Sequence, residues 1–135
     1  ETINRIIDSY PPHQQQQIRV QLANTLIGVL AQRLLRKKDG QGRVVATEIL
    51  VSNPAVRNLI REGKIYQIYS VIQTGGRQGM QLMDTSLQQL YEQGHIDYQT
   101  AVEQALDRDA MAKALKPSGG GLLDRPGGGM ESPFR

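Results

Sequence analysis

The sequence predicts an α/β protein in which amphipathic helices accompany one β-hairpin. Apolar residues recur at intervals of three and four over most of the chain, which is typical of helices that pack on one face. The stretch 31–51 instead places two strand-like runs on either side of the turn Asp39–Gly42, which is typical of a hairpin. With 135 residues, 39% of them hydrophobic, the chain is long enough to bury a core.

Composition and charge exclude several classes of function. The net charge is +3, but the basic residues are scattered and aromatic residues make up 4%, so no nucleic-acid partner is expected. The chain has no cysteine, and neither His13 nor His95 has a neighbour at ligand spacing, so no metal site is predicted. No apolar run reaches 18 residues, so we expect a soluble, cytoplasmic protein without direct membrane insertion. The chain lacks an initiating methionine and resembles a piece of a longer protein.

Two helices are predicted before the hairpin. The first covers residues 1–9 and ends because Pro11 and Pro12 disfavour helical geometry in the residue before a proline. The second covers residues 13–27, with Gly28 as its expected end. Its glutamines at positions 14–17 are interpreted as a solvated first turn. Its apolar stripe consists of Ile18, Leu22, Leu26 and Val29.

The hairpin is predicted from strands 31–37 and 43–51. Both faces of the second strand are mostly apolar, so we expect it to be covered on both sides. A two-stranded hairpin is marginal in water, which predicts that it docks on a larger sheet. One carboxylate, Glu48, lies inside this strand. An ion pair with Arg33 or another cation is the preferred interpretation, and a general base or metal ligand is the alternative.

A short helix with both ends specified by sequence follows at 53–64. Asn53 suits the N-cap, Pro54 the first helical position, and Gly63 a left-handed end. Its apolar side consists of Val56, Leu59 and Ile60, and its polar side of Arg57, Asn58, Arg61 and Glu62.

Two arginines four residues apart make this polar side unusual. A like-charge pair at this spacing costs an isolated helix about 0.2 to 0.5 kcal/mol. Arg57 and Arg61 therefore predict an anionic partner for this face.

The remainder is predicted to be helical up to residue 116. A helix at 64–73 is followed by the connector Gly75–Gly79, for which phosphate binding is the less favoured alternative because no glycine-lysine-serine/threonine ending is present. A methionine-containing stripe then marks a core helix that ends at Gly94, and Asp97 and Asp109 are expected to cap two more helices. A disordered Gly/Pro-rich tail is predicted at 117–135. The stripe consists of Met80, Met83, Leu87, Leu90 and Tyr91.

Several of these residues together resemble the retraction ATPases of type IV pili, within the secretion-ATPase superfamily. The resemblance covers about residues 1–106 and is strongest at eight residues that look like the family's retraction motif, with valine for the usual isoleucine. These eight are Ala55, Val56, Arg57, Asn58, Leu59, Ile60, Arg61 and Glu62. Further matches are Ile18-Arg19, Ala31-Gln32, the turn 39–43, Glu48-Ile49, Ile72–Gly75 and Gly79–Gln81.

The resemblance implies the C-terminal part of a RecA-like P-loop ATPase domain, at 1–52, followed by a helical C-terminal region, at 53–116. It also implies ATP and Mg²⁺ as cofactors, a homo-hexamer, and an inner-membrane platform protein as partner at the base of the pilus machine. The residues that bind ATP in the family would lie before Glu1, so no catalytic or cofactor-binding residue is expected within these 135, and the isolated chain is predicted to be inactive.

The function implied is pilus retraction in twitching motility, powered by ATP hydrolysis. We hypothesise that Arg57, Arg61 and Glu62 make contacts that switch between states, while the apolar side holds the helix in place. One alternative is a non-catalytic adaptor related to these ATPases. Another is a pilus extension or type II secretion ATPase, which the retraction-type motif disfavours.

Overall fold

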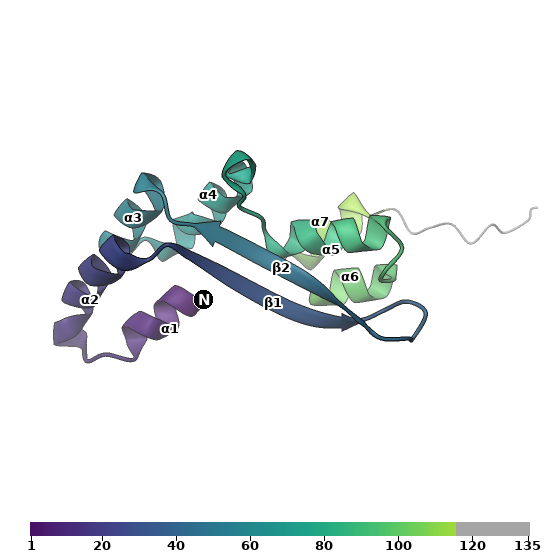
Figure 1. Ribbon diagram of the computed structural model, residues 1–135, viewed down its shortest axis with the longest axis horizontal. Coiled ribbons are helices and arrows are strands. Elements are labelled where there is room, and N and C mark those ends of the chain that lie inside the picture. Colours follow the sequence, from purple (N-terminus) through teal and green to yellow (C-terminus); the bar gives the residue numbers. More distant parts are fainter. Residues whose placement is uncertain (116–135) are drawn as a thin grey trace, which may run out of the picture.

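A computed structural model describes residues 1–115 of the chain, and the tail predicted at 117–135 lies outside this part (Figure 1). The fold is mixed α/β, with seven α-helices and one antiparallel hairpin in the described residues. No helix in residues 1–115 is both long and apolar enough to cross a membrane. The elements are α1 (Thr2–Asp8), α2 (Pro12–Thr25), β1 (Gly28–Arg36), β2 (Arg43–Val51), α3 (Pro54–Arg61), η1 (Ile65–Gln67), α4 (Ile68–Thr74), η2 (Gly76–Gln78), α5 (Met83–Glu92), α6 (Tyr98–Gln104) and α7 (Arg108–Ala114).

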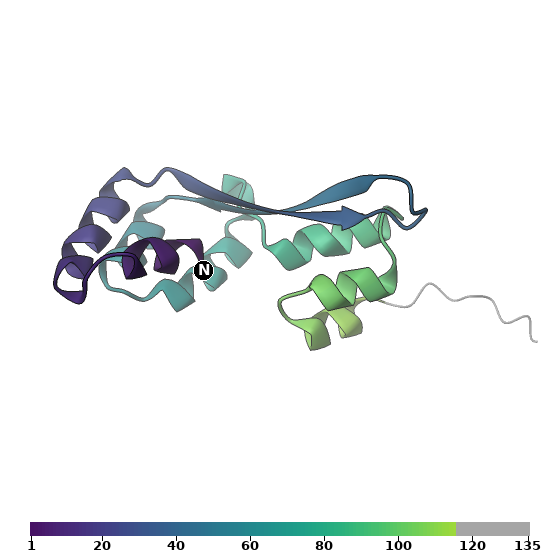
Figure 2. The same ribbon diagram turned by 90° about the horizontal axis from the view of Figure 1, so that it is seen from below.

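The hairpin runs along the length of the molecule and connects two groups of helices. Most helices lie on one side of it, with α1 to α4 toward one end and α5 to α7 toward the other (Figure 2). The pairing register places Leu30 opposite Ile49 and Leu34 opposite Val45. The hairpin predicted from sequence is confirmed, and β1 begins three residues earlier than expected.

Two apolar clusters form the core, one for each group of helices. The first joins α1 to α4 and includes Ile3, Ala23, Leu50, Val56 and Ile60. The second joins α5 to α7 to the turn end of the hairpin, through Leu35 and Ala46. Both clusters combine residues from before and after position 52.

One face of the hairpin is covered by these clusters, and much of the other face is open within residues 1–115, where the sheet has two strands. Ala46 and Leu50 are buried. On the opposite face Leu30 is 59% exposed and Leu34 is 62% exposed. Val45 of β2, which pairs with Leu34, is also exposed. On this second face Ile49 and Val51 are partly buried, and Val51 packs against the first cluster, so the open apolar surface consists of Leu30, Leu34 and Val45.

The end of α2 differs from the one expected from sequence. α2 ends at Thr25 because Leu26 is already extended, and Gly28 starts β1 instead of ending the helix. A Cβ at Gly28 would lie 2.8 Å from the Leu50 carbonyl oxygen, so the close approach of the strands requires this glycine.

Two further boundaries were predicted wrongly. The fifth helix begins at Met83, not near Met80, because Gln81 forms a two-way backbone bridge with Ile49 at the edge of β2. Asp107, not Asp109, caps α7, since its side chain accepts a hydrogen bond from the Ala110 N–H while Asp109 lies in the first turn.

Acidification is expected to loosen α6. The Asp97 carboxylate accepts the Thr100 N–H at 2.7 Å, and this backbone hydrogen bond holds the pKa of Asp97 below its usual range. A depressed folded-state pKa gives stability that is present above the unfolded value of about 3.9 and lost as pH falls through the folded value. Thermal unfolding at pH 7 and at pH 2 to 3 should therefore show an acid loss that Asp97→Asn reduces, because the amide caps without titrating. An equal acid loss in both proteins would contradict this assignment.

Candidate functional site

The helix that carries the eight-residue motif, α3, begins and ends as the sequence predicts. The Asn53 side chain accepts the Val56 N–H at 2.9 Å, Pro54 occupies the first turn, and Gly63 adopts a φ of 70° directly after the helix. Asn53 also donates to the Gln78 side chain at 2.9 Å, which ties this end to η2. The orientation of α3 is therefore fixed at its N-terminus by both local and distant contacts.

The apolar side of α3 is the most completely buried part of the helix. Val56 and Ile60 are fully buried, and Leu59 packs at the edge of the same cluster. α3 packs closely against α2, where Ala23 is also fully buried. The predicted anchoring role of these apolar residues agrees with their position.

Arg61 lies partly buried against α2, although the sequence placed it on the outside with Arg57. Its guanidinium donates to the Asn24 side-chain oxygen of α2 at 2.8 Å and to Asn58 at 3.2 Å. Its carbonyl oxygen accepts from the Gln16 side chain of α2 at 3.3 Å. Arg61 also lies in the last turn, where the helix dipole favours a cation. The side-chain partners of Arg61 are therefore neutral amides, and no anionic partner lies against this arginine within residues 1–115.

Arg57 is exposed, and its hydrogen bond within residues 1–115 is long. Its Nε donates to the Ser52 hydroxyl at 3.4 Å, and within residues 1–115 it takes part in no ion pair. Glu62 pairs with Lys64 at 3.0 Å, and this carboxylate raises the pKa of Lys64 above its ordinary value. The exposed end of the motif therefore presents an uncompensated cation at Arg57 beside a weak surface ion pair.

Glu48 has a different partner from the cation expected. Its Oε2 accepts the Met83 N–H at 3.2 Å, at the start of α5, where a carboxylate is favoured by the helix dipole. It forms no ion pair among the described residues, and Arg33 instead donates to the Gln104 carbonyl. Glu48 also borders a cavity of about 480 Å³ between the hairpin, α1 and α4, which is lined mainly by apolar side chains.

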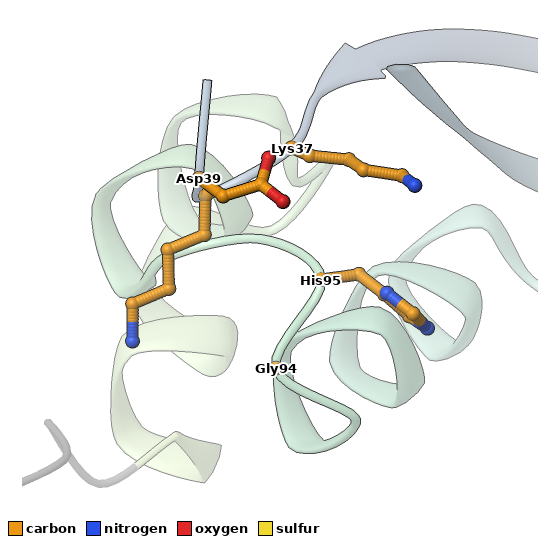
Figure 3. A pocket seen from close by; sticks show the side chains of 5 residues that line it. Lys37, Asp39, Gly94 and His95 are labelled. Carbon is orange, nitrogen blue, oxygen red and sulfur yellow. The ribbon is translucent and has the colours of Figure 1, made fainter. Parts of the chain in front are cut away.

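The glycine-rich connector and the histidine and acidic side chains are the candidates for phosphate and metal binding in residues 1–115. Gly75–Gly79 is a connector that contains η2, as predicted, and it follows helix α4 rather than a strand. No group of three or more histidine or acidic side chains in residues 1–115 could hold a metal ion. A cavity of about 390 Å³ at the hairpin turn is lined by Lys37, Lys38, Asp39, Gly94 and His95. The side chains of Lys37, Asp39 and His95 do not converge on one point, so this cavity has no preformed anion cradle (Figure 3).

Sequence reasoning missed the contribution of α2 to the motif. Gln16 and Asn24 contact Arg61, and the Arg19 guanidinium lies near Gly63, 3.5 Å from where a Cβ would stand. The glutamines at positions 14–17 were interpreted as a solvated first turn, and no role was predicted for Asn24. No local signal identifies these residues, because they lie 37 to 45 positions from Arg61.

Comparison with known proteins gives matches over most of this chain. It is 48% identical over 112 residues to a twitching motility protein of Neisseria gonorrhoeae, covering 83% of this chain and 30% of that protein. It is 46% identical over 105 residues to the type IV pilus retraction ATPase PilT of Pseudomonas aeruginosa, covering 78% of this chain and 30% of that protein. The chain thus spans about 30% of the length of the curated relatives it matches.

Structural comparison agrees with the sequence comparison. The crystal structure of the pilus retraction motor PilT with bound ADP superposes with a TM-score of 0.70 at 45% identity, covering 81% of this chain and 30% of that one. No family model matches the sequence.

Proposed function

Because the chain is PilT-like over about 30% of the length of full-length retraction ATPases, we propose that it is the C-terminal portion of an ATPase that powers type IV pilus retraction. The observation that carries this proposal is the joint similarity in sequence and fold, 46% identity to PilT of Pseudomonas aeruginosa and a TM-score of 0.70 to the ADP-bound motor. The proposed output is pilus disassembly in twitching motility.

The open face of the hairpin supports a place at the end of a RecA-like core. Leu30, Leu34 and Val45 form an exposed apolar surface that a larger sheet or its helices would cover. We assign residues 1–52 to the end of that core and 53–116 to the helical C-terminal region. The boundary at residue 52 is proposed for the full-length protein.

ATP and Mg²⁺ belong, in this proposal, to residues outside the 135 of this chain. The described residues offer neither a phosphate-binding turn after a strand nor a cluster of metal ligands, so they do not fit the nucleotide. ATP hydrolysis is therefore proposed for the full-length protein, and the 135-residue chain is expected to be inactive.

The proposed role of the motif is to transmit the effect of hydrolysis to its mechanical output. A helix fixed by Val56 and Ile60 can present Arg57 at a defined place, where an acidic partner engaged in one state would bias the conformational equilibrium. The proposed assembly is a cytoplasmic homo-hexamer that acts on the platform protein at the inner-membrane base of the pilus machine.

The test uses the full reading frame that contains this sequence. Its purified product is expected to hydrolyse ATP and to restore twitching to a strain that lacks its own retraction ATPase. The 135-residue chain, assayed in parallel, is expected to show no saturable turnover.

Each alternative predicts a different result. A full-length product that binds pilus-machine proteins without hydrolysing ATP would support the adaptor. Hydrolysis combined with restored pilus assembly in a strain lacking the extension ATPase would support an extension or secretion ATPase. Saturable turnover by the 135-residue chain would overturn the assignment of the nucleotide site to residues outside it.

A further inference from the structure

The two arginines of the motif differ in their surroundings more than their four-residue spacing suggests. Arg61 is partly buried and makes two side-chain hydrogen bonds, of which the shorter, at 2.8 Å, reaches across to Asn24 on α2. Arg57 is exposed, and its two terminal guanidinium nitrogens make no hydrogen bond within residues 1–115. Arg61 is therefore hydrogen-bonded within the chain, whereas Arg57 is exposed to solvent.

The Arg61–Asn24 contact is a polar link between two helices that also pack through apolar side chains. Ala23, directly before Asn24, is fully buried against the cluster that contains Val56 and Ile60. The Gln16 side chain of α2 adds a second polar contact, donating to the Arg61 carbonyl oxygen at 3.3 Å. A directional, charge-assisted hydrogen bond fixes rotation and sliding between the helices in a way that apolar packing does not.

We propose that Asn24 is a positioning residue for the retraction motif: it holds Arg61, so that α2 and α3 move as one body and Arg57 is presented in a fixed direction. This inference rests on the proposed function for its output, but the contact itself is a property of this chain. Asn24 acts through Arg61 and makes no contact with substrate.

The contact is tested first without any assay of activity. Asn24→Ala, Arg61→Ala and the double variant are compared by thermal unfolding of the protein. Alanine also raises helix propensity at position 24, so single variants are ambiguous and the cycle isolates the pair. The double variant is expected to lose less than the sum of the single losses, with a difference of about 4 °C or more. Additive losses would overturn the proposal.

Gln21→Ala provides a matched control. Gln21 is an exposed amide on α2, one helical turn before Asn24, and its side chain makes no recorded hydrogen bond. Its alanine variant should show no coupling to Arg61→Ala. Coupling of similar size at both positions would show that the effect is a general property of α2 and would overturn the assignment to Asn24.

The positioning role is tested in the full-length protein by comparing ATP turnover with pilus retraction. Asn24→Ala is expected to change turnover less than twofold and to reduce retraction about threefold or more, a range typical of residues that modulate coupling. Asn24→Asp should preserve retraction, because a carboxylate still accepts from Arg61 and strengthens the bond.

The outcomes separate this inference from the proposed function. Equal retraction in Asn24→Ala and wild type, or equal losses in Asn24→Ala and Asn24→Asp, would overturn the positioning role. A wild-type protein with neither turnover nor retraction would overturn the proposed function, while the unfolding cycle would still decide whether Asn24 and Arg61 are coupled.

Discussion

Arg57→Glu in the full-length protein is expected to abolish pilus retraction while ATP hydrolysis continues. Arg57 is exposed on a helix that is anchored by fully buried side chains, so the substitution should leave the fold intact. A like-charge contact with an acidic partner costs several kcal/mol, which corresponds to a loss of about a hundredfold or more in the output. Twitching zones and single-pilus retraction events measure the output, and phosphate release measures turnover.

Arg77→Glu is the matched control for this experiment. Arg77 is an exposed arginine on η2, outside the motif, so reversing its charge changes the net charge by the same amount. It is expected to retain retraction. A similar loss from both variants would indicate a general effect of charge, and retention of twitching by Arg57→Glu would remove Arg57 from the coupling surface.

Ile60→Ala is expected to have the largest effect on stability of the changes considered. Ile60, a residue of α3, is fully buried within the first apolar cluster, so truncation removes buried apolar surface and leaves a cavity. Such substitutions cost about 2 to 5 kcal/mol. Urea unfolding followed by circular dichroism should show a lower midpoint with an unchanged slope.

Leu106→Ala serves as the control for the loss of a large apolar side chain. Leu106 is 70% exposed, so its truncation is expected to change the free energy of unfolding by less than about 0.5 kcal/mol. Equal losses at both positions would show that the burial of Ile60 does not determine its contribution.

The local features of the motif helix could be predicted because their causes lie within a few residues. Asn53 accepts from Val56, three positions away, and Gly63 supplies the positive φ that ends the helix. The apolar spacing of Val56 and Ile60 correctly predicted which side would be buried. The hairpin was predicted for the same reason, since its turn glycines and strand-like runs are adjacent.

Two of the errors occurred where the decisive partner is distant in sequence. Glu48 was matched to a cation, but its partner is the Met83 N–H, 35 positions away. The start of α5 was misplaced because the Gln81 bridge to Ile49 replaces the first helical turn. In both cases the partner is a backbone group from a distant segment, which no local sequence pattern reveals.

The sequence by itself determined the element types, the two ends of the motif helix and its anchored apolar side, because caps, turns and periodicity are local interactions. Only the tertiary structure decided that the two arginines have different surroundings. Arg61 reaches Asn24, 37 residues earlier, because α2 packs against α3, whereas Arg57 lies on the side that no described element covers. Such a distinction depends on which helix face meets which neighbour, and spacing within one helix carries no information about that.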